Sequence, residues 1–112
     1  MARSLRSGGI ERNAATSGNI CDAILTPCPG DITFPIIRRL CGAGLVVSED
    51  EALMAVAQAC LRRKVVAEPG GAVALAAALC RQDALDGDDV IVTISGGNVD
   101  PALFARALET LG

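Results

Sequence analysis

The stretch VIVTISGGN, residues 90–98, decides the expected fold. Its first five residues are apolar or β-branched, which is typical of a strand that is covered on both faces of a parallel sheet. The polar and glycine residues that follow, 95–98, indicate a turn at the carboxyl end of that strand. Ligands of open parallel sheets bind at the carboxyl ends of the strands. The stretch therefore predicts a buried strand and a candidate ligand site beside it.

Strand and helix signals alternate on the N-terminal side of this stretch. Residues 45–47 (LVV) predict a short strand, and the sequence SEDE at 48–51 is a capping box for a helix that runs to about Lys64. Residues 65–67 predict a brief extended piece. Residues 71–79 (GAVALAAAL) predict a helix that is apolar on every side and is therefore expected to be buried on every side.

The C-terminal end of the chain completes the alternation. Asp100 and Pro101 are N-cap and first-turn signals for a last helix. The order strand, helix, strand, helix, strand, helix predicts an α/β fold: a small, mainly parallel sheet with flanking helices and right-handed crossovers. Aromatic residues make up only 2% of the chain, so alanine and small aliphatic residues are expected to build the core.

The first part of the chain carries weaker signals. Residues 34–41 predict a short helix, whereas residues 20–25 are compatible with a short helix or a strand. Residues 1–19 are polar, without an apolar period, and are expected to be an N-terminal arm or linker. Residues 20–112 are then expected to form the α/β domain.

Composition excludes several kinds of chemistry. The chain has no histidine, which excludes His-based acid–base catalysis, Ser-His and Cys-His nucleophiles and ordinary His metal sites. Its only lysine, Lys64, ends an Arg-Arg-Lys run that predicts a solvated helix end rather than a catalytic amine. A net charge of −3 argues against a nucleic-acid or anionic-membrane partner.

The five cysteines indicate a reducing compartment. None forms a C-x-x-C pair, and their odd number does not describe a disulfide framework. Cys60 and Cys80 are expected to be small core hydrophobes. The longest apolar run, residues 72–80, is too short to cross a bilayer, and the N-terminus lacks the apolar region of a signal peptide. We expect a cytoplasmic protein without a membrane partner.

Two segments are candidates for a binding site. Ser95 offers a hydroxyl, and Gly96 and Gly97 permit positive φ and a close approach of backbone to a ligand. Such a glycine pair after a strand is also common in an ordinary tight turn. Glu68 would point into a crevice beside the Ser95 strand, or would be a solvated acid at a helix N-terminus.

These segments together resemble a known family. The stretches ICDAILTPCPGDITFPIIRRL (20–40), GLVVSEDEAL (44–53), VVAEPGGAVALAAAL (65–79) and VIVTISGGNVDPALFARAL (90–108) are similar to the C-terminal part of the pyridoxal-phosphate-dependent serine/threonine dehydratases. This fold-type-II family includes the serine racemases. The resemblance implies a partial fold-type-II large domain and an enzyme that converts threonine or serine to a 2-keto acid and ammonia.

The resemblance also implies a set of cofactor-binding residues. Ser95 would hydrogen-bond the pyridine nitrogen of pyridoxal phosphate, Glu68 would lie close to that contact, and Gly96, Gly97 and Asn98 would shape the wall. The family's Schiff-base lysine lies in an N-terminal Ser-x-Lys-x-Arg-Gly motif, and a glycine-rich loop in the middle of the family chain holds the phosphate. Neither has a counterpart here, so no catalytic residue and no metal ligand is assigned to this chain.

Three functions follow as hypotheses. The first is the C-terminal part of a dehydratase that is inactive alone and works with a missing N-terminal part or as a homo-oligomer. The second is a non-catalytic module that self-associates through strand edges left unpaired. The third is a small-molecule or phosphate-binding protein that uses the turn from Ser95 to Asn98.

Overall fold

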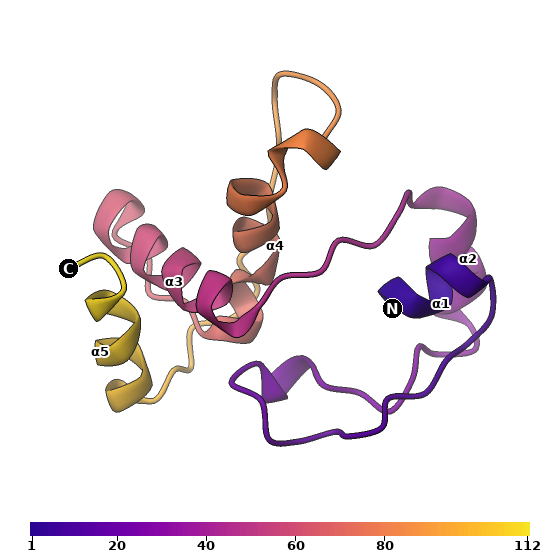
Figure 1. The fold of residues 1–112 in the computed structure, drawn as a ribbon, viewed down its shortest axis with the longest axis horizontal. Coiled ribbons are helices and arrows are strands. Elements are labelled where there is room, and N and C mark those ends of the chain that lie inside the picture. The colour runs from indigo at the N-terminus through magenta and orange to yellow at the C-terminus, as the bar shows by residue number, and fades with distance from the viewer.

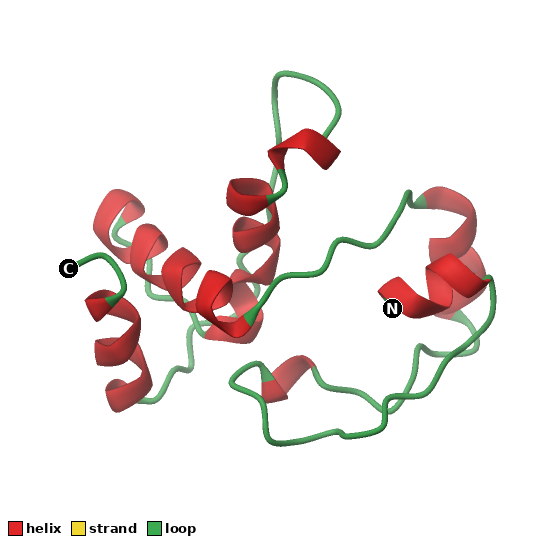
Figure 2. Cartoon of the chain, in the orientation of Figure 1, coloured by secondary structure: helices red, strands yellow, loops and turns green.

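A computed structural model describes all 112 residues and consists of helices and loops. Figure 1 shows the elements along the chain, and Figure 2 shows that none of them is a strand. The α-helices and the two short 3-10 helices are α1 (Ala2–Ser7), η1 (Asp22–Ile24), α2 (Thr33–Leu40), α3 (Glu49–Arg63), α4 (Pro69–Cys80), η2 (Gln82–Ala84) and α5 (Pro101–Glu109). The predicted sheet is therefore wrong for this chain by itself, whereas the helices after residue 33 lie where the sequence predicts them.

The three predicted strands run as irregular segments because they lack hydrogen-bonded neighbours. Residues 45–47 and 90–94 make no backbone hydrogen bond, and only Val65 of the segment 65–67 makes one. Ile91 is 98% exposed, so nothing covers the outer face of the segment that was expected to be buried on both faces. A strand needs a neighbouring strand to satisfy its backbone groups. The apolar pattern is thus present without the partners that would turn it into a sheet.

The core lies where α4 and α5 each pack against α3, in the left half of Figure 1. Leu53 and Val56 of α3 are its largest fully buried apolar side chains. The remaining members are alanines from all three helices and from the segment between α3 and α4, each of them fully buried: Ala55, Ala67, Ala72, Ala76 and Ala107. Small side chains let the helix backbones approach closely, which confirms the expectation of an alanine-built core.

Local capping signals fix the starts of α3 and α5. The Ser48 hydroxyl accepts a hydrogen bond from the Glu51 amide at 3.1 Å, and a Glu51 carboxylate oxygen accepts one from the Ser48 amide at 2.7 Å. The Asp100 carboxylate accepts hydrogen bonds from the amides of Ala102 and Leu103. The predicted capping box and the predicted N-cap are confirmed.

Helix α4 differs from its prediction in burial. Its N-terminal half is buried, including Gly71 and Ala72, but Leu79 is 39% exposed because α3, η1 and η2 cover only part of the helix surface. The expectation that the helix is buried on every side was wrong. Cys60 and Cys80 are only half-buried, so their expected place in the core was wrong as well.

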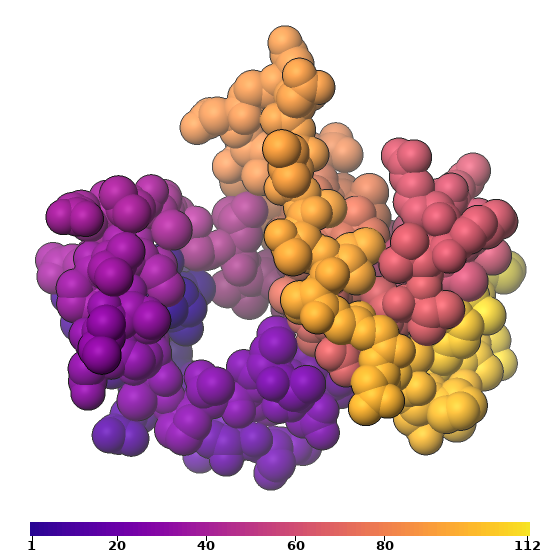
Figure 3. All heavy atoms as spheres, turned by 180° about the vertical axis from the view of Figure 1, so that it is seen from behind, coloured from indigo at the N-terminus to yellow at the C-terminus, as the bar shows by residue number.

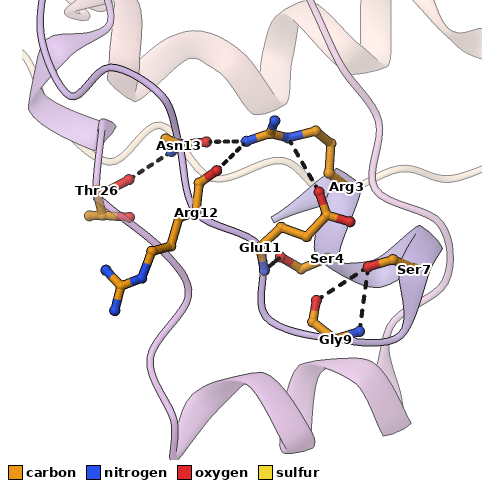
Figure 4. A network of polar contacts seen from close by, with 8 residues as sticks. All are labelled: Arg3, Ser4, Ser7, Gly9, Glu11, Arg12, Asn13 and Thr26. Carbon is orange, nitrogen blue, oxygen red and sulfur yellow. Dashed lines mark hydrogen bonds and ion pairs between the residues drawn. The ribbon is translucent and has the colours of Figure 1, made fainter.

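The N-terminal segment is folded onto itself instead of forming a plain arm. Residues 2–7 form α1, and the buried Ser4 hydroxyl accepts a hydrogen bond from the Glu11 amide at 2.9 Å. The Arg3 guanidinium donates to the Arg12 carbonyl and to the Asn13 side chain, both at 2.9 Å (Figure 4). Residues 2–7 thus form a helix within the expected arm or linker, whereas residues 8–19 contain no regular element. A domain boundary at residue 20 stays a prediction.

The molecule is flat and open. Its dimensions are 41 × 36 × 18 Å, and its radius of gyration is 14.6 Å, against about 13 Å for a compact domain of this length. Helices α1 and α2 lie apart from the α3–α5 core, and two long segments, residues 8–32 and 41–48, bridge the two parts (Figure 1). Figure 3 shows an opening between them. No helix is long and apolar enough to cross a membrane.

Candidate cofactor-binding site

The turn after residues 90–94 lies directly against the start of α4. The Glu68 amide donates to the Gly96 carbonyl at 3.0 Å, and the Ser95 amide donates to the Gly71 carbonyl at 3.3 Å. These two hydrogen bonds tie the turn to the segment that enters the helix. The structure thus brings Glu68 and Ser95 together, as expected for neighbouring strands, although no sheet is formed.

Glycines make this contact possible through close approach. A Cβ atom on Gly71 would lie 2.6 Å from the Gly96 carbonyl oxygen, and a Cβ atom on Gly97 would lie 2.7 Å from the Val66 carbonyl oxygen. The place of a Gly96 side chain is taken by the Glu68 carboxylate. None of these glycines has a positive φ. Gly97 is therefore required for backbone contact and Gly96 leaves room for the Glu68 carboxylate, whereas the positive φ that both glycines permit is not used.

The two polar side chains of the site have different surroundings. Ser95 is exposed, and its hydroxyl takes part in no hydrogen bond of the chain, so it is free to donate or accept one. Glu68 is half-buried with its carboxylate against the Gly96 backbone. Glu68 thus covers the turn, and Ser95 offers the free polar group.

Asn98 lies on another side of the same turn. It shares a pocket of about 260 Å³ with Glu68, Asn19 and Asp22, which η1 and the segment before it bring against α4. Ser95 does not line this pocket. The predicted site residues therefore face two surfaces. Asn19 and Asp22 were missed by the sequence analysis, and the only sequence signal for them is their polar character beside an ambiguous apolar segment.

Lys64 lies outside both surfaces. It is exposed at the C-terminal end of α3 with φ 59°, and its ammonium donates to the Leu61 carbonyl at 2.9 Å. This is the position expected for a solvated cation at a helix end. Nothing desolvates the amine as a catalytic Schiff-base lysine requires.

The donor set fits one end of pyridoxal phosphate. A free hydroxyl such as that of Ser95 can pair with a pyridine nitrogen. No lysine or arginine lines the neighbouring pocket, so the phosphate end finds no cation there. The described side chains form no His, Cys, Asp or Glu group that could hold a metal ion.

Comparisons with known proteins show the family of the chain. A family model described as "Pyridoxal-phosphate dependent enzyme" matches residues 1–97. The serine racemase of Dictyostelium discoideum is 39% identical over 110 residues, which are 96% of this chain and 34% of that protein. The L-threonine ammonia-lyase of Thermotoga maritima is 36% identical over 97% of this chain and 27% of its own length. The chain belongs to the pyridoxal-phosphate-dependent enzyme family.

Solved structures give the same result. A threonine deaminase from T.th. superposes with a TM-score of 0.76 at 36% identity, covering 88% of this chain and 33% of its own. The serine racemase of Dictyostelium discoideum superposes with a TM-score of 0.77 at 42% identity, covering 88% and 31%. The chain spans about a third of the length of the relatives that it matches.

Proposed function

We propose that this chain forms the cofactor-ring side of a pyridoxal-phosphate-dependent threonine or serine ammonia-lyase and is inactive alone. One observation carries the proposal: the Ser95 hydroxyl is free, and α4 holds the backbone beside it through the bonds to Gly71 and Gly96. The matched relatives include an L-threonine ammonia-lyase and a serine racemase, which supports this reaction class.

A serine at this position suits elimination. When bound, pyridoxal phosphate acts as an electron sink for an amino acid substrate. The neutral Ser95 hydroxyl would bind the ring nitrogen without holding it protonated as a carboxylate would, which weakens that sink. Loss of a β-hydroxyl from threonine or serine would require a weaker electron sink than transamination would. Ser95 would therefore favour ammonia release, while Glu68 positions the turn.

The other groups of such an enzyme would come from a second part. The chain's only lysine is exposed at the end of α3, and no cation lines the pocket beside the turn. Residues 45–47 and 90–94 leave their backbone groups unpaired, and Val46 and Ile91 are 61% and 98% exposed. We propose that an N-terminal dehydratase part supplies the neighbouring strands and that residues 45–47, 65–67 and 90–94 then join a parallel sheet.

Complementation tests this proposal. The chain is mixed with the part of the Thermotoga maritima L-threonine ammonia-lyase that lies outside the match, and complex formation is followed by size-exclusion chromatography. We expect a complex that releases 2-keto acid from threonine when pyridoxal phosphate is added, whereas the chain alone releases none. Activity of the chain alone that Lys64→Ala abolishes would overturn the proposal.

Two variants separate assembly from chemistry. Ser95→Ala removes a single exposed hydroxyl, so we expect the complex to form with roughly tenfold lower activity, as the loss of one hydrogen bond predicts. Ile91→Lys places a charge on the face expected to be covered, and we expect it to weaken the complex itself. Equal activity of Ser95→Ala and the unsubstituted chain would contradict the assigned role of Ser95.

Self-association is a second candidate that the same exposed segments favour. Unpaired strand edges and apolar surface are buried when two copies pair. Sedimentation velocity of the chain alone would then show a concentration-dependent dimer that Ile91→Lys disrupts. A monodisperse monomer would exclude this candidate.

All five cysteines are free, which supports a reducing, cytoplasmic location for either function.

A further inference from the structure

A second pocket lies in the other half of the molecule, between α1 and α2. Its volume is about 280 Å³, and its lining consists of Ala2, Leu5, Arg6, Arg38 and residues 41–44. It shares no residue with the turn at Ser95 or with the pocket beside it.

The pocket is positively charged, and no acidic side chain neutralises its arginines. The salt bridges of the chain join Arg3 to Glu11 and Arg81 to Glu51, so neither Arg6 nor Arg38 has an acidic partner. No aspartate or glutamate lines the pocket. Two arginines without acidic partners thus line one hollow in a chain whose net charge is −3.

The backbone around the pocket adds unpaired amide donors, and a glycine beside it makes room for an arginine side chain. The amides of Gly42, Ala43 and Gly44 donate no hydrogen bond within the chain. Arg38 reaches across to the end of α1, where Gly8 has φ 80° and a Cβ atom would lie 3.1 Å from an Arg38 guanidinium nitrogen. Because Gly8 has no side chain, the Arg38 guanidinium fits against it.

We propose that this pocket binds the phosphate group of a phosphate monoester. Guanidinium groups pair with phosphate oxygens in a bidentate geometry, and unpaired amides of a glycine-rich turn bind the same oxygens. A phosphate monoester carries a charge of about −1.5 to −2 at pH 7, which matches the two arginines. The pocket exceeds the size of a phosphate ion, so it leaves room for an organic remainder. This site is independent of the proposed cofactor-ring site.

Titration with inorganic phosphate tests the proposal. The chain is titrated at constant ionic strength, set with sodium chloride, while ¹⁵N–¹H NMR follows the amides of Gly42, Ala43 and Gly44. We expect saturable shifts of these amides that chloride alone does not produce. Shifts that chloride reproduces, or that do not saturate, would overturn the proposal.

Matched arginine variants locate the site. Arg38→Gln and Arg6→Gln each remove one charged hydrogen-bonding group, and we expect each to weaken phosphate binding by about tenfold or more. Arg62→Gln on α3 removes another exposed arginine, outside the pocket, and should leave the affinity unchanged. Equal weakening by all three variants would show nonspecific attraction and would overturn the proposal.

Two further arms identify the source of the phosphate and the independence of the site. Adenosine monophosphate that binds more tightly than inorganic phosphate would show that an organic remainder uses the additional room, and equal affinity would assign the site to free phosphate. Ser95→Ala should leave the phosphate titration unchanged. A weakened titration in Ser95→Ala would contradict a site of its own between α1 and α2.

Discussion

Glu51 and Arg81 form a two-point ion pair that joins the start of α3 to the end of α4. Arg81 Nη1 lies 2.6 Å from Glu51 Oε1, and Nη2 lies 2.8 Å from Oε2. The same carboxylate accepts a hydrogen bond from the Ser48 amide. The Glu51 side chain thus caps its own helix, α3, and also binds the end of α4. Elements 30 residues apart in sequence are thereby fixed together.

This pair predicts a loss of stability at acid pH. The hydrogen bonds from Arg81, followed by the Ser48 amide, lower the pKa of Glu51 from 4.5 to about 2. The Glu51 carboxylate therefore takes up a proton more readily in the unfolded chain than in the folded one. The contribution of the ion pair to the free energy of unfolding is complete above about pH 5 and disappears as the pH falls towards 2. Thermal unfolding followed by far-ultraviolet circular dichroism should show this dependence weakened in Glu51→Gln. An identical dependence in the variant would contradict the assignment.

Gly71→Ala should destabilise the chain although it places alanine in a helix. Alanine gains about 1 kcal/mol over glycine in a helix interior. The new methyl group would lie 2.6 Å from the Gly96 carbonyl oxygen, and overpacking against backbone costs about 1–3 kcal/mol, so we expect a net loss of about 1 kcal/mol. Urea unfolding of both proteins measures this change in the free energy of unfolding. Gly9→Ala, where nothing lies within 4 Å, is the control and should be near neutral.

Lys64→Gly should stabilise the chain. Lys64 has φ 59° and ψ 32°, a left-handed conformation that costs a non-glycine residue roughly 1–2 kcal/mol. The exposed bond from its ammonium to Leu61 offsets little of this cost, so we expect a net gain of about 1 kcal/mol in the free energy of unfolding. Lys64→Ala removes the same ammonium but keeps the strain. If both variants behave alike, the strain is not the cause.

The cysteines should react with N-ethylmaleimide in a defined order. Cys41 is exposed, whereas burial, followed by the charges of Glu49 and Asp22, raises the pKa of the Cys21 thiol. The thiolate is the reactive form, so Cys41 should be modified several-fold faster at neutral pH. Peptide mapping by mass spectrometry measures both rates. Labelling in urea is the control, because unfolding should remove the difference.

The sequence predicts those features that depend on neighbouring residues. The capping box at Ser48 and the N-cap at Asp100 are bonded within three residues, so their patterns predict the starts of α3 and α5. Helix α1 escaped prediction because six residues carry no apolar period, and contacts beyond the helix, such as the Glu11 amide donating to the Ser4 hydroxyl seven residues earlier, hold the segment in place.

Features that depend on distant partners were predicted only in part. A β-branched run such as residues 90–94 indicates a strand, but a strand forms only when another strand pairs with it. The approach of Glu68 to Ser95 was nevertheless predictable, since both follow apolar segments that a sheet would align. The position of Asn19 and Asp22 in the pocket beside Glu68 was not predictable, because it depends on the path of the long segment between α1 and α2.

The contact between the turn and α4 also determines how this region can move. Gly71 meets the Gly96 backbone and Gly97 meets the Val66 carbonyl, so main chain lies against main chain and no rotamer change separates the segments. Side chains rearrange on picosecond to nanosecond timescales, whereas collective movements of whole elements take microseconds or longer. The turn and the first part of α4 should therefore move as one rigid body, and the position of the Ser95 hydroxyl should follow the orientation of the helix.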